Sequence, residues 1–316
     1  ALSAALAGIE PGRLVVGGFS AASNVTGILS DVEGITRQLK AAGALAVWDY
    51  AGAGPYLPIR MTPAPDAAID AIVTSPHKFA GGPAASGVLL VRRSAVSAEV
   101  PTLPGGGTVR FVSPEGHDYA HSIEAREEAG TPNVIGDIRA ALAFVVKEAI
   151  GQDFIDCRNA ELRDRAKAAW AGQTRIEILG NPQARRLPIF AFRLCDGMGG
   201  HVHQQLATRM LSDLYGIQAR GGCACAGPYV HRLLGIDETR SRTLRAAILA
   251  GQEMSKPGFV RLNFSYLLSD AEADRIIDSV ADLASRAPSL AAHYTHDPAT
   301  AIFVAGKALN DATTLA

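Results

Sequence analysis

The stretch TSPHKFAGGPAASG, residues 74–87, combines a Ser-x-His-Lys with a glycine-rich turn, and it lies between two short apolar runs. Those runs, residues 71–75 and 86–93, have the length of strands. A lysine held beside hydrogen-bonding neighbours can become nucleophilic toward a carbonyl group. A lysine directly after a strand is also a common surface residue, so the stretch alone leaves both interpretations of Lys78 open.

Upstream of this stretch, apolar runs alternate with helical patterns. Residues 13–19 (RLVVGGF) and 44–50 (ALAVWDY) are continuous apolar runs, and residues 31–42 have helical spacing between an N-capping residue and Gly43. Apolar strands separated by helices are typical of βαβ units. The sequence therefore predicts an α/β fold with a mainly parallel sheet and helices on both of its faces.

The second half of the chain has a different pattern. Residues 134–150 and 153–171 are two long helical patterns. After them, strands are predicted at residues 176–179, 187–194 and 258–265, and helices at residues 199–215, 238–251 and 270–286, the last with Ser269 as N-cap. We therefore expect a large domain at residues 1–150 and a small α+β domain at residues 151–316.

Two segments lack a clear periodic pattern. Residues 101–133 are rich in Gly, Pro, His and charge, which predicts a long functional loop. The Ala-rich tail after Pro288 predicts irregular structure or a segment wrapped on a partner.

Composition limits the class of protein. The chain has 316 residues, of which 48% are hydrophobic and 19% charged, as in folded proteins of about two domains. Its net charge of −1 gives no excess of positive charge of the kind that binds nucleic acid or anionic lipid. No apolar run approaches the roughly 18–20 residues that a bilayer span requires. Four cysteines are too few for a disulfide framework, which favours a cytoplasmic setting.

Two further polar residues follow predicted strands of the same sheet. Asp49 comes at the end of the run at residues 44–50, and Asn24 follows the run at residues 13–19. Open α/β sheets bind ligands at the carboxyl ends of their strands, where a carboxylate can pair with a protonated ring nitrogen. For Asp49 alone, a turn or an N-cap is the simpler alternative.

Taken in chain order, these motifs resemble a known family. They are Asn24 in SNVTG, Asp49 in WDYAG, Lys78 in SPHKFAGG and Arg126 in REEAGTPN. The set resembles the fold-type I pyridoxal-phosphate enzymes of aminotransferase class V, most closely the cysteine desulfurase and selenocysteine lyase branch. The resemblance extends over essentially the whole chain and implies pyridoxal 5′-phosphate (PLP) as cofactor.

The resemblance also implies roles in the large domain. Lys78 would form the internal aldimine and then move a proton by way of a quinonoid intermediate. Asp49 would bind the pyridine nitrogen, and Ala51 would pack on one face of the ring. Ser75 and His77 would hold the phosphate.

Other implied roles concern the substrate and a second subunit. Asn24 would lie near the phenolic oxygen of the cofactor and near the substrate. Arg261, in FVRLNFSY, would clamp the substrate carboxylate, although a surface arginine on a strand edge is the alternative. Gly106, Gly107 and Thr108 resemble a loop presented to the cofactor phosphate of a neighbouring subunit, which implies a homodimer.

The sequence departs from the family pattern at two places. Many relatives carry Gln where this chain has Gly52. In residues 220–228 (RGGCACAGP), Cys225 aligns with the desulfurase cysteine that carries a persulfide, but Cys223 stands two residues before it. A persulfide or redox role for Cys225 and a packing or helix-terminus role for both cysteines remain open.

No metal site is predicted, because a second cysteine pair at ligand spacing does not occur. Cys157 and Cys195 lie in a helical and a strand pattern and are expected in the core. The chain starts at Ala1 without Met, and nothing before Arg13 resembles the beginning of the family domain. We expect roughly 150 residues of that domain, the usual scale of one domain, to precede this chain.

The sequence thus predicts a PLP-dependent enzyme that acts on a small amino acid. Transamination and Cβ–Sγ cleavage share the same early steps, and the cysteine loop favours cleavage, with a sulfur-acceptor protein as possible partner. A true transaminase without desulfurase activity is one alternative. A catalytically silent PLP-fold scaffold or binding module is the other.

Overall fold

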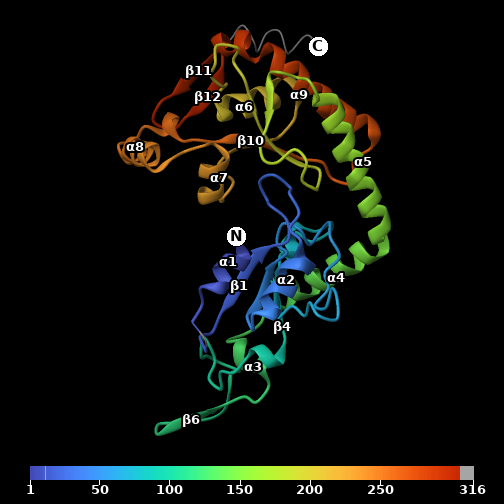
Figure 1. The fold of residues 1–316 in the computed structure, drawn as a ribbon, viewed down its shortest axis with the longest axis vertical. Helices are drawn as coiled ribbons and strands as arrows, with labels where there is room; N and C mark the ends of the chain where they lie inside the picture. The colour runs from blue at the N-terminus through green and yellow to red at the C-terminus, as the bar shows by residue number, and fades with distance from the viewer. Residues whose placement is uncertain (11, 307–316) are drawn as a thin grey trace. The chain divides into compact units, whose positions relative to one another are not determined.

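The computed structural model describes residues 1–10 and 12–306 and divides into two compact units (Figure 1). Unit 1 comprises Ala1–Ala22 and Ser30–Phe154, and unit 2 comprises Ser23–Leu29 and Ile155–Ala316. The segment Ser23–Leu29 is therefore part of unit 2, although residues of unit 1 precede and follow it in the sequence.

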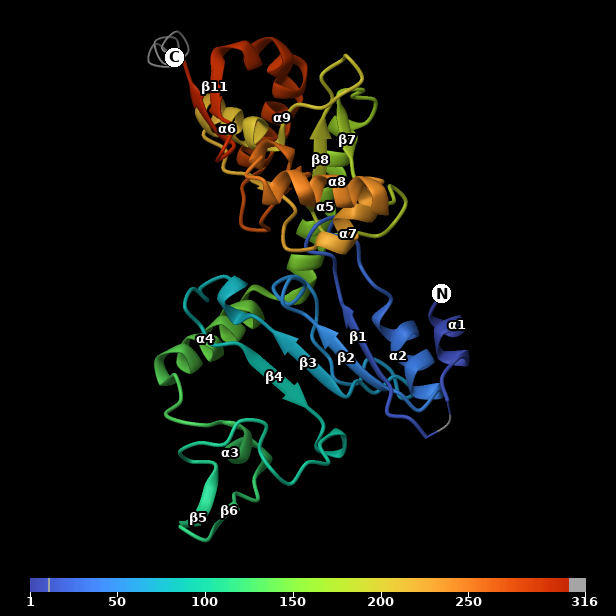
Figure 2. The ribbon, with the colours of Figure 1, turned by 90° about the vertical axis from the view of Figure 1, so that its left-hand side faces the viewer.

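Unit 1 is built on a four-stranded sheet in the order β1-β2-β3-β4 (Figure 2). Its strands are β1 (Val16–Ser20), β2 (Leu45–Asp49), β3 (Ala71–Thr74) and β4 (Val88–Val91). β1, β2 and β3 run parallel, and β4 runs antiparallel to β3. The predicted α/β fold with a mainly parallel sheet is confirmed.

Helix α2 (Val32–Ala41) connects β1 to β2 and begins where its sequence pattern predicts. The side chain of Asp31 caps it by accepting a hydrogen bond from the backbone N–H of Gly34 at 2.9 Å. Trp48 of β2 is fully buried and donates its indole N–H to Thr36 of this helix at 2.8 Å. This bond satisfies both buried polar groups and fixes the helix against the strand.

The other helices of unit 1 are α1 (Leu2–Ala7), α3 (Ile123–Glu127) and α4 (Val134–Ile150), with the 3₁₀ turns η1 (Pro76–Lys78) and η2 (Arg93–Ala95). The sequence pattern predicts one long loop at residues 101–133, and the structure shows that this prediction is wrong. They form a hairpin of β5 (Val109–Ser113) and β6 (Gly116–Tyr119), which projects away from the sheet (Figure 2), and then α3. The hairpin is largely exposed and therefore lacks the apolar alternation that would reveal it.

Unit 2 contains an antiparallel sheet in the order β7-β8-β10-β9. Its strands are β7 (Ile176–Ile178), β8 (Ile189–Leu194), β9 (Arg220–Gly222) and β10 (Phe259–Asn263). Its helical segments are α5 (Gln152–Trp170), α6 (Gln204–Tyr215), α7 (Gly227–Leu233), α8 (Glu238–Leu249), η3 (Glu253–Ser255), α9 (Asp270–Leu290) and η4 (Ala291–His293). Helix α6 contacts α9, β9 and β10.

Three expectations for unit 2 need correction. α6 begins at Gln204 rather than at residue 199, because the side chain of His203 accepts from the backbone of Gln205 and caps the helix there. The tail after Pro288 is regular as far as residue 306, beyond which it lies outside the described residues: α9 continues to Leu290, and β11 (Tyr294–Asp297) pairs with β12 (Ile302–Ala305). Cys157 is exposed, because the buried face of α5 is formed by residues such as Ile155 and Leu162.

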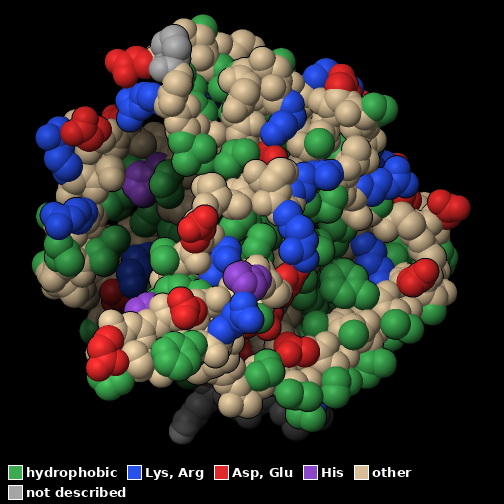
Figure 3. All heavy atoms as spheres, turned by 90° about the horizontal axis from the view of Figure 1, so that it is seen from below, with side chains coloured by type: hydrophobic (Ala, Val, Ile, Leu, Met, Phe, Trp, Pro, Cys, Tyr) green, Lys and Arg blue, Asp and Glu red, His purple; other side chains and the backbone are tan. Residues whose placement is uncertain are grey.

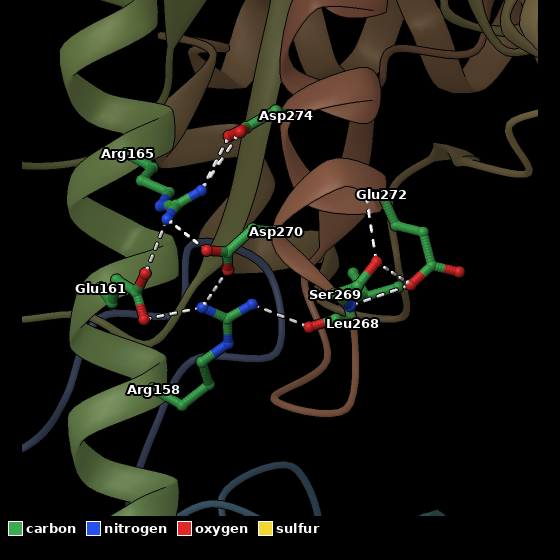
Figure 4. Close-up of polar contacts among 8 residues, drawn as sticks. All are labelled: Arg158, Glu161, Arg165, Leu268, Ser269, Asp270, Glu272 and Asp274. Carbon is green, nitrogen blue, oxygen red and sulfur yellow. Dashed lines mark hydrogen bonds and ion pairs between the residues drawn. The ribbon is translucent and has the colours of Figure 1, made fainter.

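Helices α5 and α9 are joined by a network of ion pairs (Figure 4). Arg158 contacts Glu161 at 2.6 Å and Asp270 at 2.7 Å, and Arg165 contacts Asp270 at 2.8 Å and Asp274 at 3.1 Å. The two guanidinium groups hold the pKa of the Asp270 carboxyl below its usual range. Asp270 is the first residue of α9, where a negative charge also favours the helix dipole.

The surface carries charges of both signs. Acidic and basic side chains are interspersed with exposed apolar ones on the face shown in Figure 3. Within the described part of the chain, none of the helices is both long enough and apolar enough to span a bilayer. The same residues include no cluster of three or more His, Cys, Asp or Glu side chains arranged to hold a metal ion.

Candidate active site

The carboxyl ends of β2 and β3 place two of the predicted residues at one edge of the sheet of unit 1. Asp49 is the last residue of β2 and lies opposite Val73 of β3. One of its carboxylate oxygens accepts the backbone N–H of Ala51 at 2.6 Å. Lys78 follows β3 by a single 3₁₀ turn, so it begins from the same edge as Asp49.

The turn that carries Lys78 depends on tight backbone packing. Pro76 is buried at its start, and the N–H of Lys78 donates to the carbonyl of Ser75 at 3.0 Å. A Cβ atom at Gly82 would lie 1.9 Å from the carbonyl oxygen of Pro76, so glycine is required where the chain folds back. The glycine-rich sequence therefore serves this turn directly.

The two basic side chains of this turn are accessible to solvent. His77 and Lys78 are exposed, and Ser75 is half-buried. Among residues 1–10 and 12–306, the Lys78 amine has no hydrogen-bond or ion-pair partner, so it is available to an incoming group.

A second lysine, which sequence analysis did not single out, supports the loop after Asp49. Lys147 of α4 donates from Nζ to the carbonyls of Gly54 at 2.7 Å and Leu57 at 2.5 Å. Its ammonium also lies 5.6 Å from the centre of the ring of Phe79, the residue that follows Lys78 in the sequence. No sequence motif indicates this role of Lys147, because its partners are backbone carbonyls about 90 positions away in the sequence.

Thr108 lies elsewhere in unit 1 and is fully buried. Its hydroxyl donates to the carbonyl of Gly105 at 2.6 Å and accepts the N–H of the same residue at 3.1 Å. Both hydrogen bonds of this hydroxyl are thus made within the turn at residues 105–108. A role of Thr108 toward the phosphate of a neighbouring subunit stays a prediction.

In unit 2, the two cysteines of residues 220–228 have different surroundings. Cys225 is exposed, and Nη2 of Arg220 donates to its sulfur at 3.3 Å. Cys223 is half-buried, and its sulfur donates to the carbonyl of Pro257 at 3.0 Å. Burial raises the pKa of the Cys223 thiol, with a smaller opposing effect of Lys256. Cys223 is therefore held as a neutral thiol, whereas Cys225 presents its sulfur beside a cation.

Arg261 and Asn24 complete the set in unit 2. Arg261 of β10 is paired in register with Arg220 of β9, so two guanidinium side chains start from one face of the sheet. Nη1 of Arg261 donates to the backbone carbonyl of Asn24 at 3.0 Å, and Nδ2 of Asn24 donates to the carbonyl of Ala224 at 2.8 Å. Two arginines on one face suit a carboxylate.

The position of Asn24 differs from the one expected. β1 ends at Ser20, and Asn24 lies four residues further on, in the segment Ser23–Leu29 that packs within unit 2. A strand end next to Asp49 was expected because Asn24 follows an apolar run closely. The sequence contains no local sign that the chain leaves the sheet before this residue.

The donor set of unit 1 fits the chemistry of PLP. An unpaired amine at Lys78 suits an aldehyde, and the second carboxylate oxygen of Asp49 suits a protonated ring nitrogen. The hydroxyl of Ser75 and the imidazole of His77 are donors of the kind that bind phosphate. At Gly52 the chain offers no side chain for a contact with the phenolic oxygen.

Comparison with known proteins gives a consistent result. A family model described as aminotransferase class-V matches residues 2–256. The chain is 32% identical over 230 residues to probable cysteine desulfurase 2 of Mycobacterium leprae, covering 72% of this chain and 52% of the relative. It is 33% identical over 207 residues to a cysteine desulfurase of Pectobacterium atrosepticum, covering 65% and 48%. The chain thus spans about half the length of these curated relatives.

Solved structures show the same fold. The apo structure of a cysteine desulfurase from Thermococcus onnurineus matches with a TM-score of 0.72 at 24% identity, over 90% of this chain and 62% of that one. A cysteine desulfurase from Escherichia coli, in an S-sulfonic acid form, matches with a TM-score of 0.70 at 24% identity over the same shares.

Proposed function

The chain belongs to the aminotransferase class-V family, and from this premise we propose that the protein is a PLP-dependent enzyme that removes sulfur from a small amino acid such as L-cysteine. The observation that carries the proposal is the environment of Cys225. This exposed cysteine has the guanidinium of Arg220 at 3.3 Å from its sulfur, on the strand that pairs with Arg261. A nucleophilic thiolate and a carboxylate-binding arginine are what such a reaction requires.

We assign the cofactor to the residues of unit 1. PLP, when bound, supplies an electron-accepting ring that stabilises negative charge at the substrate Cα. Lys78 would hold its aldehyde covalently, and Asp49 would keep its ring nitrogen protonated. Ala51 would pack on the ring, and Ser75 and His77 would donate hydrogen bonds to its phosphate.

The remaining steps use side chains of this protein. Arg261 would bind the substrate carboxylate through its planar guanidinium, with Asn24 beside it. The Lys78 amine would take the proton from the substrate Cα and later return a proton to the product. Because this amine is exposed and has no hydrogen-bond or ion-pair partner in the described part of the chain, no protein group holds it away from the cofactor or the substrate.

The sulfur step balances without an external oxidant. The Cys225 thiolate attacks the substrate sulfur, a sulfur–sulfur bond forms, and the substrate Cβ–Sγ bond breaks with its electron pair left on carbon. Protonation of that carbon converts L-cysteine into L-alanine. The product on the protein is a persulfide at Cys225, whose negative charge the guanidinium of Arg220 stabilises.

The experiment that tests the proposal measures sulfide and alanine released from L-cysteine by the purified protein supplied with PLP. Cys225→Ala should abolish sulfide release, whereas Cys223→Ser should leave most of it, because serine can keep the hydrogen bond to Pro257. Keto acid formed from another amino acid, without sulfide from cysteine, would indicate a transaminase instead. A colourless protein that PLP cannot restore would indicate a silent scaffold.

Partners and compartment follow from the same proposal. A persulfide requires an acceptor, so we propose a sulfur-acceptor protein as partner. We also propose a homodimer, which sedimentation of the purified protein tests. A cytoplasmic location agrees with four cysteines that are all free thiols.

A further inference from the structure

Four side chains of unit 2 are linked around the cysteine loop. Arg220 and Arg261 are neighbours across β9 and β10. Arg220 reaches the sulfur of Cys225 at 3.3 Å, and Arg261 reaches the backbone carbonyl of Asn24 at 3.0 Å. The amide of Asn24 then closes the circuit, because its Nδ2 donates at 2.8 Å to the carbonyl of Ala224, the residue before Cys225.

The loop at this point has an unusual backbone. Ala224 has a φ of 49° and Cys225 a φ of 59°, so two successive residues with side chains lie in the left-handed region. Such residues are uncommon and persist only where their surroundings hold them. Ala224 is buried in a small apolar cluster with Val25, the residue after Asn24.

The segment Ser23–Leu29 is itself anchored at several places. The hydroxyl of Ser23 accepts the backbone N–H groups of Val25 at 3.2 Å and Thr26 at 3.1 Å. The hydroxyl of Thr26 lies 3.2 Å from that of Tyr229 in α7. A Cβ atom at Gly27 would lie 2.9 Å from Ile189 of β8, so this residue approaches the sheet closely. The segment is thus a fixed support rather than a loose connection.

We infer that Asn24 is a positioning residue for the sulfur of Cys225, which it holds beside Arg220 by fixing the carbonyl of Ala224. The inference rests on the proposed function only in that Cys225 is the reacting cysteine. Asn24 joins the two parts of this circuit: its backbone carbonyl accepts a hydrogen bond from Arg261, and its side-chain amide donates one to Ala224 in the cysteine loop. Loss of its amide should let Ala224 and Cys225 relax toward ordinary backbone angles and move the sulfur away from the guanidinium.

The test compares two alkylating reagents at Cys225 in the purified protein without added cofactor. Iodoacetate is anionic and iodoacetamide is neutral, so the ratio of their rate constants reports how close the cationic Arg220 lies to the sulfur. Fragment-ion mass spectrometry separates Cys225 from Cys223, and low ionic strength keeps the charge effect large. Arg220→Gln gives the ratio expected when the guanidinium is absent.

We expect Asn24→Ala to lower the iodoacetate to iodoacetamide ratio by about fivefold, the factor that corresponds to losing the attraction between two unit charges about 4 Å apart in water. Asn24→Gln, which keeps an amide donor, should recover part of the ratio. The matched control is Thr26→Val, which removes a hydrogen bond from the same segment without touching Ala224 and should leave the ratio unchanged. If Asn24→Ala does not fold, Asn24→Leu replaces it with a side chain of similar size.

Two results would overturn the inference. The first is a ratio that stays at its wild-type value in Asn24→Ala, including the case in which both rate constants rise equally, which would show a merely structural role. The second is an equal fall of the ratio in Thr26→Val, which would assign the effect to the whole segment. The proposed function fails separately, by sulfide release that survives Cys225→Ala, and that outcome leaves the ratio untouched.

Discussion

The two units differ in where their apolar side chains lie. In unit 2, Trp170, Phe190 and Phe264 are almost fully buried and their rings lie 5.2 to 6.3 Å apart, in one continuous core. In unit 1, the edge strand β4 leaves Leu89 62% exposed, and the helix α4 leaves Ile135 63% exposed. The aromatic core is therefore expected to dominate the stability of unit 2, whereas unit 1 holds Lys78 at the end of an open sheet. We expect substitution of Lys78 to change activity with little loss of stability, and substitution within the aromatic core to change stability.

The largest effect is expected at Lys78. Lys78→Ala should lower the rate of sulfide release by a factor of about 10³ to 10⁴, the range for a lost proton-transfer group with its covalent role added. Because the side chain is exposed and has no hydrogen bond or ion pair in the described chain, the free energy of unfolding should change by less than about 0.5 kcal/mol. Steady-state rates and urea unfolding of the same preparation measure both quantities.

The matched control is Lys167→Ala, which removes an exposed lysine that donates a long hydrogen bond of 3.3 Å to the carbonyl of Pro182. It should change neither quantity. Sulfide release at the wild-type rate by Lys78→Ala would contradict the assignment of this residue, and a large loss of stability would contradict the expectation that its side chain does not support the fold.

The next effect is expected in the aromatic core of unit 2. Phe190→Ala should lower the free energy of unfolding by about 3–5 kcal/mol, because a fully buried ring leaves a cavity between Trp170 and Phe264. The chain has two tryptophans, Trp48 in unit 1 and Trp170 in unit 2. Fluorescence in a Trp48→Phe background therefore follows the unfolding of unit 2 by itself.

Leu89→Ala is the control for this prediction. It also removes a large apolar side chain, but from the exposed edge of the sheet in unit 1, so the expected loss is below about 0.5 kcal/mol. Equal losses for Phe190→Ala and Leu89→Ala would break the comparison between the units.

The regular elements with strong local patterns were the ones that the sequence predicted well. The pattern at residues 134–150 coincides with α4, and Ser269 caps α9 as predicted, with its side chain accepting from the backbone of Glu272. β9 was missed, because three residues that include two glycines carry no periodicity. Local signals predict the elements that are long and amphipathic and fail for those that depend on neighbours.

The candidate site shows the same limit. The residue types at Asp49, Lys78 and Cys225 are visible in the sequence because each lies in a short motif. The contact from Asn24 to Ala224 joins residues 200 positions apart, and the support of the Asp49 loop by Lys147 joins residues about 90 apart. Such contacts arise from tertiary packing and leave no trace in the local pattern.

A smaller effect is expected from a well-shielded ion pair at the N-terminal end of β3 in unit 1. Asp70 is 5% exposed and accepts the backbone N–H of Ala46 at 2.7 Å and the amine of Lys40 at 2.8 Å. Lys40→Met should cost about 2 kcal/mol, because it leaves a buried carboxylate without its counter-charge. Urea unfolding followed by Trp48, in a Trp170→Phe background, measures the loss in unit 1.

The double variant Lys40→Met, Asp70→Asn tests the cause. If the loss comes from an uncompensated charge, the double variant should be more stable than Lys40→Met alone. A double variant that is less stable would show that Lys40 acts through packing of its aliphatic stem instead.

The smallest effect is expected from a surface ion pair in unit 2. Glu177 of β7 lies opposite Arg193 of β8, and their side chains meet at 2.7 Å. Arg193 in the first place, and His201 in addition, hold the pKa of Glu177 below its ordinary value of about 4.5. A lowered pKa in the folded state stabilises the protein above the unfolded pKa, and this contribution is lost as the pH falls through the folded pKa.

Glu177→Gln should therefore cost less than about 1 kcal/mol at pH 7, since the carboxylate is 40% exposed and solvent screens the pair. The difference from wild type should shrink below about pH 4.5 and vanish once the pH is under the folded pKa, because both proteins are then neutral at this position. Unfolding followed by Trp170 at neutral and acidic pH measures it, with Glu238→Gln, whose pair is 3.8 Å long and exposed, as control. A cost at pH 7 as large as that of Phe190→Ala would mean that charge pairs, rather than the aromatic core, stabilise unit 2.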